Sequence, residues 1–290
     1  MTQLNKFSLT EWLNQAQSEG IDFADFLLRY NSKNLDTSKD KILLEMNAML
    51  EVMRNSILSG LQGLKSPSGM VGGAAKQICN STAPSLIGLP LRQALMRAIA
   101  VGEANASMGK IVAAPTAGAS GIIPAVLFTL QEQLDLNDSK LIKGLIVAGG
   151  IGLVIASRAS LAGAIGGCQA ECGSGAAMAA GMAVYLAGGS NAQIANAVAI
   201  TLKNMLGLVC DPVAGLVEVP CIKRNAGATA QALVSAELAL LDIVSVIPVD
   251  EVIDAMKQVG DALPCSLRET AQGGLAITPT ALKLNKQIFG

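Results

Sequence analysis

The chain has 290 residues, with 21 Lys and Arg against 22 Asp and Glu, and its formal net charge is −1. A sequence this close to neutral carries no basic face for nucleic acid, and no nucleic-acid partner is expected. Because 51% of the residues are hydrophobic and only 3% are aromatic, we expect a core of small aliphatic side chains between closely packed helices.

Helical signals recur along the whole chain. Ser8 with Glu11, and Ser190 with Gln193, are capping-box patterns that mark helix starts, and Pro90 suits the first turn of a helix. Between these points, apolar residues three and four positions apart mark helix faces. In chain order, the predicted helices cover about 9–30, 42–60, 90–108, 124–134, 140–157, 190–206, 226–246 and 249–259.

The segments between these helices show no series of hairpins, no alternation of strands with helices and no fixed-period repeat. Residues 31–39 are polar and predict a loop, and residues 110–114 predict a short extended segment. We therefore predict an all-α fold with a single helical domain over residues 1–290. An N-terminal helical segment, about 1–35, belongs to it, and glycine-rich functional loops join the helices.

Two uncharged stretches raise the question of a membrane. Residues 172–202 contain several glycines and polar side chains, and residues 144–157 are too short for the ~20 apolar residues of a membrane helix. Buried core helices are the favoured interpretation over a small-residue membrane bundle. Residues 1–10 have no apolar signal core. We expect a cytoplasmic location, where six cysteines are not expected to form structural disulfides.

Four cysteines lie beside glycine or proline. Cys168 and Cys172 belong to the segment GGCQAECG, and Cys210 and Cys221 flank DPVAG and VP. Such neighbours are typical of loops in which a thiolate can face a shared metal, whereas a cysteine in a packed helix is usually a small hydrophobe. The spacing is neither that of a zinc ribbon nor that of a ferredoxin. Metal ligation, catalysis and packing all stay open on this pattern.

Two loops of small residues, 66–73 and 114–121, are candidate binding segments. Both offer backbone N–H groups and hydroxyls, and the second leads into a predicted helix start, which favours a bound carboxylate or phosphate. Ordinary helix connections have the same composition, and neither loop matches a phosphate loop or a dinucleotide fingerprint. The sequence contains no histidine. This excludes histidine-based nucleophile systems and histidine metal ligands from the chain itself.

Four segments, in this order, resemble the α subunit of bacterial iron–sulfur-dependent L-serine dehydratase. They are SPSGM at 66–70, GKIVAAPTAGASG at 109–121, GGCQAECG at 166–173 and CDPVAGLVEVPC at 210–221. The resemblance covers nearly the whole chain. It implies a helical catalytic part, an oxygen-sensitive [4Fe–4S] cluster held by Cys168, Cys210 and Cys221, and a separate β subunit, because the β domain of single-chain members is absent here. Some members end in a cysteine that approaches the cluster, but this chain ends KQIFG.

The resemblance implies conversion of L-serine to pyruvate and ammonia. Three protein thiolates would leave one iron open as a Lewis acid for the departing hydroxyl. The loops would then bind substrate, through Ser66, Ser68, Gly69, Thr116, Gly118 and Ser120. The general base is not identified by the sequence. Lys65 and Lys110 are weak candidates because lysines beside loops are more often solvated or paired, and the role of Cys172 is open.

Two other classes of protein compete with this interpretation. A pyridoxal-phosphate dehydratase would need a Schiff-base lysine and usually an α/β fold, which the helical pattern disfavours. A non-catalytic iron–sulfur or zinc-binding helical protein would need a fully ligated site whose signal does not respond to serine.

Overall fold

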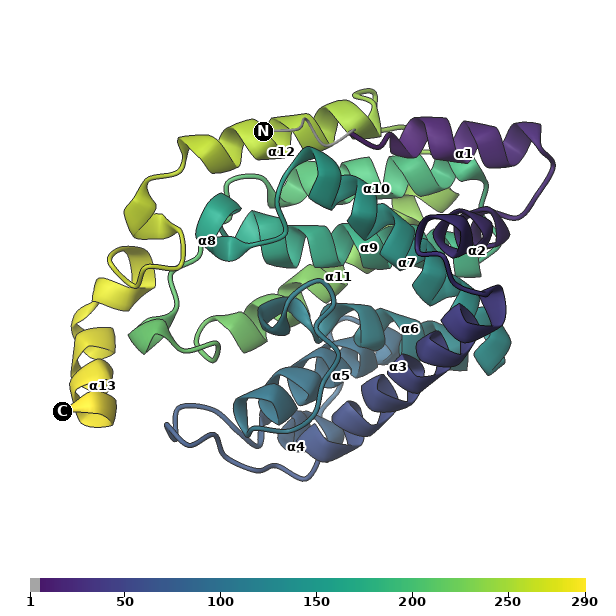
Figure 1. Cartoon of the computed structure of the whole chain (residues 1–290). Helices are drawn as coiled ribbons and strands as arrows, with labels where there is room; N and C mark the ends of the chain where they lie inside the picture. The colour runs from purple at the N-terminus through teal and green to yellow at the C-terminus, as the bar shows by residue number, and fades with distance from the viewer. Residues whose placement is uncertain (1–5) are drawn as a thin grey trace.

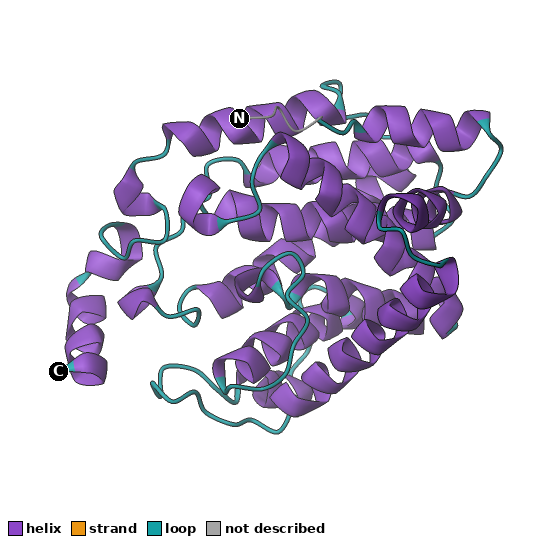
Figure 2. Cartoon of the chain, viewed as in Figure 1, coloured by secondary structure: helices purple, strands orange, loops and turns teal. Residues whose placement is uncertain are grey.

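The computed structural model describes residues 6–290, which form thirteen α-helices and no β-strand (Figures 1 and 2). The all-α prediction is confirmed for this part of the chain. The helices are α1 (Leu9–Ser18), α2 (Phe23–Asn34), α3 (Lys39–Gly60), α4 (Ala74–Cys79), α5 (Leu89–Ala106), α6 (Ile122–Leu134), α7 (Asp138–Arg158), α8 (Gly163–Gly166), α9 (Ser174–Leu186), α10 (Asn191–Met205), α11 (Cys221–Leu240), α12 (Val249–Ala262) and α13 (Pro279–Phe289).

Helix α9 lies in the middle of the bundle, against α6, α7, α10 and α11 (Figure 1). Twelve of its 13 residues are buried, most of them alanine or glycine. A Cβ atom at Gly181 would lie 2.3 Å from Ile151 Cδ1 on α7 and 3.0 Å from Val198 Cγ2 on α10. Glycine here therefore lets both neighbouring helices approach α9 closely. Because α9 is buried on every side, it has no polar face, and helix periodicity did not predict it.

The N-terminal prediction needs a correction. The expected helix over 9–30 is two helices, since α1 ends at Ser18 and α2 begins at Phe23. The Asp22 side chain starts α2 by accepting hydrogen bonds from the N–H groups of Ala24 and Asp25, at 3.0 and 3.3 Å. Helix α2 then runs four residues into the predicted polar loop, which is confined to residues 35–38.

Most other predicted helices lie within a few residues of the observed ones. Ser190 and Gln193 form a complete capping box at the start of α10. Helix α6 begins at Ile122, and residues 110–114 form no strand. The larger difference is α11, predicted over 226–246, which begins at Cys221. This earlier start places Cys221 in the first turn of a helix.

Helix α7 is, within the described residues, the one helix long and apolar enough to cross a membrane by these criteria alone. Its most apolar window is 61% buried inside the bundle. Leu145, Ile151 and Ile155 are among its buried side chains. Burial of this kind is typical of a core helix, as the sequence predicted.

Candidate functional site

Four of the six cysteines gather at one place in the fold. Cys168, Cys172 and Cys210 are at most 3% exposed and Cys221 is partly buried, whereas Cys79 and Cys265 are exposed. Cys168 is close enough to shift the pKa values of the other three, and Cys221 those of Cys172 and Cys210, which places the sulfur atoms near one another. The three ligands predicted from the sequence are therefore among the four cysteines that the fold brings together.

Three separate elements carry these cysteines. Cys168 and Cys172 lie at a π-helical turn, Gln169–Gly173, that leads directly into α9. Single π turns are frequent at functional sites because they redirect side chains out of the regular helix. Cys210 lies in the segment after α10, where its N–H donates to Leu267 O at 2.9 Å and its carbonyl accepts from Glu269 N at 2.7 Å. These two backbone hydrogen bonds hold the segment with Cys210 against the part of the chain that leads to α13.

Burial and mutual proximity shift the thiol pKa values. The hydrogen bond between the side chains of Cys168 and Cys172 lowers the pKa of Cys168 and raises that of Cys172. Burial is the main cause that raises the pKa of Cys221 to about 12, and it raises the pKa of Cys210 as well. Without a cation, most of these sulfurs stay protonated. A bound metal centre would offset this cost by stabilising several thiolates at once.

The spacing of the sulfurs bears on the kind of metal centre. Within residues 6–290, the possible ligand atoms that all lie within 4.8 Å of one another belong to Glu171, Cys210 and Glu269. A tetrahedral zinc ion with Zn–S bonds of about 2.3 Å holds its sulfurs about 3.8 Å apart. No three cysteines of the described chain meet even the looser limit. The three cysteines are therefore not arranged around one tetrahedral zinc ion, whereas Glu171, Cys210 and Glu269 could hold a single metal ion.

Glu171 lies between the sulfurs and the loop 114–121. Its carboxylate is 3.8 Å from Cys210 Sγ, and a Cβ atom at Gly118 would lie 3.6 Å from both carboxylate oxygens. Burial raises the pKa of this carboxyl group. Thr116 Oγ1 is close enough to favour the ionised form, yet it is buried without a hydrogen-bond partner in the structure. An unpaired buried hydroxyl next to a carboxylate indicates a place where a polar ligand binds.

The loop 66–73 is held at the same site by Glu218. Its carboxylate accepts hydrogen bonds from Ser66 Oγ at 2.8 Å and from Ser68 Oγ at 2.6 Å. The neighbouring Val217 lies against the second loop, because a Cβ atom at Gly118 would be 3.4 Å from Val217 Cγ1. The dipeptide Val217–Glu218, shortly before Cys221, therefore contacts both glycine-rich loops.

Asn225, on the first turns of α11, anchors the second loop. Its Nδ2 donates to Gly118 O at 2.6 Å, and its Oδ1 accepts from Gly121 N at 3.0 Å. This side chain is 2% exposed. The helix that begins with Cys221 thus fixes the loop that carries Thr116 and Gly118.

The remaining predicted residues lie differently. Ser120 is 1% exposed and donates to Ala117 O at 2.8 Å, so its hydroxyl proton is used inside the loop. Gly69 has a φ of 75°, which favours glycine, and has open space on its Cβ side. Lys65 and Lys110 are exposed. The structure therefore brings Ser66, Ser68, Thr116 and Gly118 to the residues around the sulfurs and leaves the two lysines at the surface.

Sequence reasoning missed the polar residues Glu171, Glu218, Arg224 and Asn225. One signal for Glu171 was present, since it is the one charged residue between Arg158 and Lys203. A lone charge in an apolar stretch has a high desolvation cost, which indicates a specific role. The other three carry no comparable signal in their local sequence.

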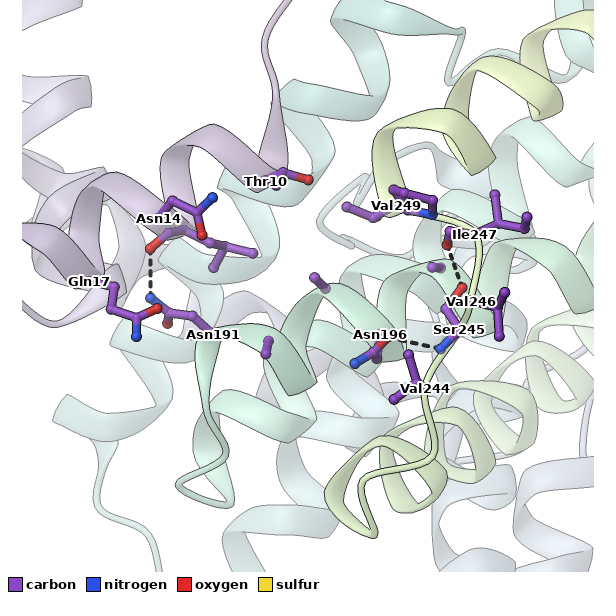
Figure 3. A pocket seen from close by; sticks show the side chains of 15 residues that line it. Thr10, Asn14, Gln17, Asn191, Asn196, Val244, Ser245, Val246, Ile247 and Val249 are labelled. Atoms are coloured by element: carbon purple, nitrogen blue, oxygen red, sulfur yellow. Dashed lines mark hydrogen bonds between the residues drawn. The ribbon is translucent and has the colours of Figure 1, made fainter.

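A second hollow lies elsewhere, between α1, α10 and the loop from α11 to α12 (Figure 3). Its volume is about 300 Å³. The polar side chains that line it are amides and hydroxyls, such as Asn14, Asn191 and Asn196, and no lining residue is ionisable. This hollow has no titratable side chain for acid–base chemistry and no thiol or carboxylate for metal ligation. The site around the sulfurs is therefore the stronger candidate for catalysis.

The fold and the site define a helical protein with a buried thiol cluster beside two glycine-rich loops. The family model for the serine dehydratase alpha chain matches residues 16–276. The chain is 46% identical over 285 residues to a probable L-serine dehydratase alpha chain of Bacillus subtilis (98% of this chain, 95% of that protein). The L-serine dehydratase alpha chain of Peptoniphilus asaccharolyticus is 42% identical over 282 residues (96% and 97%). This chain belongs to the serine dehydratase alpha-chain family.

One relative is much longer than this chain and matches it over only part of its length. L-serine dehydratase 2 of Escherichia coli is 44% identical over 184 residues, which is 63% of this chain and 40% of that protein. The helical part is therefore one portion of a longer chain in that relative, whereas the alpha chains of the other two species match this chain almost end to end.

Proposed function

We propose that this chain is the catalytic subunit of an L-serine dehydratase, an ammonia-lyase that converts L-serine to pyruvate and ammonia. Membership of the family supports the reaction, and relatives that span nearly the whole chain bear this activity in their names. Within the site, the position of Glu171 is the observation that carries the proposal. Its carboxylate lies beside both the Cys210 sulfur and the unpaired Thr116 hydroxyl.

The cofactor that we propose is a [4Fe–4S] cluster held by Cys168, Cys210 and Cys221. Support comes from the burial of these cysteines, from their different elements and from a spacing too wide for a tetrahedral zinc ion. When bound, a cluster with three protein ligands supplies a Lewis acid for the hydroxyl leaving group at the iron without a protein ligand. Cys172, which is 1% exposed beside Cys168, then supports that ligand through the hydrogen bond between their side chains.

The chain's own residues bind and orient serine. Ser66 and Ser68 each give their hydroxyl proton to Glu218, so their oxygens can accept from a donor such as the substrate ammonium; Ser68 Oγ already accepts one hydrogen bond, from Met70 N at 3.1 Å. The Glu218 carboxylate behind them favours the same positive charge. Thr116 Oγ1, with no partner in the structure, offers a donor to the substrate carboxylate. Backbone N–H groups of the loop with Gly118 add donors of the same kind.

Removal of the α-proton needs a base within reach of the bound substrate. Glu171 is half-buried and faces both the loop and the sulfurs, so it is placed to take this proton on a carboxylate oxygen. Lys65 and Lys110 are the other candidates, from exposed positions next to the loops. Loss of the α-proton and the β-hydroxyl gives aminoacrylate, which tautomerises and hydrolyses to pyruvate and ammonia.

The proposal includes a partner and a location. The names of the matched relatives specify alpha chains, which supports a separate β chain that acts with this one. We also propose that the protein works in the cytoplasm, without a nucleic-acid or membrane partner. A non-catalytic iron–sulfur protein is the alternative, and it predicts a metal signal that does not change when serine is added.

The test is anaerobic purification of the full chain with its β chain, followed by iron, sulfide and serine-to-pyruvate assays. We expect about four irons and four sulfides per chain, with activity that is lost on aeration. Cys168→Ser, Cys210→Ser and Cys221→Ser should each lose the cluster, whereas the exposed Cys79→Ser and Cys265→Ser should keep it. An intact cluster in the Cys210 variant would refute the ligand assignment. A colourless chain that is active with pyridoxal phosphate would refute the mechanism.

A further inference from the structure

Arg224 lies in the first turn of α11, three residues after Cys221, and its side chain crosses to the segment that carries Cys210. Its Nη1 donates to Val209 O at 2.8 Å, and its Nη2 lies 2.8 Å from Asp211 Oδ1. The two acceptors are the immediate neighbours of Cys210 on either side. One guanidinium therefore fixes the segments of two proposed ligands relative to each other.

The same guanidinium is close to the third proposed ligand. Its side chain lies within hydrogen-bond reach of the Cys168 sulfur. Arg224 therefore contacts Cys168 and Asp211 at once. The Arg224 side chain is 19% exposed and the Asp211 side chain 4% exposed, so water screens these charges only weakly.

Asp211 extends this arrangement to the C-terminal segment. Its Oδ2 accepts a hydrogen bond from Leu275 N at 2.7 Å. A Cβ atom at Gly274 would lie 2.3 Å from the same oxygen, so glycine permits this contact. The arginine thus has a fixed partner on the side away from the sulfurs, which holds its planar group in one orientation.

We propose that Arg224 is the positioning residue of the metal centre: it holds the three cysteine segments in register and places a permanent positive charge against the bound cluster. This inference rests on the proposed function, because it needs the cluster. Three thiolates give such a cluster a net negative charge, and a neighbouring cation and hydrogen bonds to sulfur stabilise it. The unbound site is already arranged for that charge, since the Arg224 guanidinium lies beside the Cys168 sulfur.

A purely structural ion pair is the competing explanation, and Arg158 provides the matched control. Its Nη2 lies 2.6 Å from Asp254 Oδ2, its Nη1 donates to Phe7 O at 3.2 Å, and its side chain is 15% exposed. Arg158 therefore makes the same two kinds of contact as Arg224 at similar burial, but it holds the N-terminal segment to α12. Arg158→Gln should cost folding stability without an effect on the cluster.

The experiment compares cluster retention in the full chain purified with its β chain. Wild type, Arg224→Gln, Arg224→Lys and Arg158→Gln are reconstituted anaerobically with ferrous iron and sulfide. The loss of visible absorbance is then followed after a ferrous chelator is added. We expect the Arg224→Gln cluster to decay about tenfold faster than wild type, as is typical when a residue behind the metal ligands is removed. Arg224→Lys should be intermediate, because an ammonium keeps the charge but not the two-pronged contact.

Each outcome decides the matter. Equal decay in wild type and Arg224→Gln would overturn the inference while the proposed function stands. Equally fast decay in Arg158→Gln would show that general stability is the cause, and would also overturn it. If the Gln variant does not fold, as judged by circular dichroism, the Lys variant carries the comparison. A wild-type chain that takes up no cluster would refute the proposed function itself.

Discussion

Glu218 accepts a hydrogen bond from Ser66 at 2.8 Å across 152 residues of sequence. The bond joins the first glycine-rich loop to the segment that leads into Cys221. Ser66 is 5% exposed and Glu218 7% exposed, so this contact is shielded from water. The proposed substrate-binding loop and a proposed metal ligand are therefore held together by one carboxylate.

We expect Glu218→Ala to weaken both substrate binding and the fold. The variant removes the acceptor of two hydroxyls, and hydrogen bonds to a charged group contribute about 1.5–3 kcal/mol each. The KM for serine should rise at least tenfold, because Ser66 and Ser68 lose the partner that orients them. Glu218→Gln should be milder, since one oxygen remains. Steady-state kinetics and thermal unfolding of both variants measure the two effects.

The control for this variant is Glu51→Ala. Glu51 is a half-exposed carboxylate that pairs with Arg54 on α3, and such surface pairs contribute little. We expect its KM to equal that of wild type. An unchanged KM in the Glu218→Ala variant would mean that the loop 66–73 does not bind substrate.

Alkylation of the metal-free chain should distinguish the two classes of cysteine. Cys79 and Cys265 are exposed and should react first with iodoacetamide at pH 8. Burial raises the pKa of Cys221 to about 12, so only about one in ten thousand of these groups is the reactive thiolate at that pH. Its rate should rise about tenfold for each pH unit up to 10. Mass spectrometry of the digested protein measures each site.

This labelling also tests the gathering of the sulfurs. Cys210, whose pKa burial raises as well, should be protected like Cys221. Modification of Cys210 as fast as that of Cys265 would contradict the buried arrangement described above.

The sequence predicts those helices that have one face in the core and another exposed to solvent. Helices α5, α7 and α10 each have apolar and polar residues in a helical period, and α10 has its capping box. Helix α9 has no such contrast because it touches neighbours on all sides, so its Ala and Gly residues carry no periodic signal. The division between α1 and α2 depends on the Asp22 cap and on Gly20, with a φ of 66°, both inside what looked like one apolar pattern.

The residues of the candidate site also divide into those that the sequence reveals and those that it does not. Its cysteines and glycine loops stand out in the sequence because unusual residues cluster there. Glu218, Arg224 and Asn225 do not stand out, since their importance comes from partners far along the chain, such as Ser66 or Gly118. Long-range pairing of this kind is set by tertiary packing, which a local pattern does not encode.

Glu171→Gln should make the metal-free chain more stable at neutral pH while it abolishes activity. Burial raises the pKa of Glu171 in the folded state. The folded protein therefore binds this proton more tightly than the unfolded chain does, and stability falls as pH rises through the raised pKa. A neutral glutamine does not incur this loss. We expect the variant's gain in melting temperature to be present at pH 8 and to vanish below pH 4.

The control is Glu11→Gln, a carboxylate at the exposed start of α1. It should show no gain at pH 8. A Glu171→Gln variant with full activity would remove Glu171 from the reaction and leave Lys65 or Lys110 as the base.

Gly163→Ala should disturb the site without unfolding the protein. A Cβ atom at Gly163 would lie 2.6 Å from Glu171 Oε2 and 3.2 Å from Cys210 Sγ. The end of the Glu171 side chain can move aside, so melting should change little, but the carboxylate leaves its place beside the sulfurs. Misplacement by about 1 Å costs up to about 100-fold in rate, and we expect kcat to fall at least tenfold. Gly149→Ala on α7, with nothing within 4 Å of its Cβ position, should instead keep kcat and gain about 0.5–1 kcal/mol of stability. Equal kcat values in the two variants would show that the position of Glu171 does not limit the reaction.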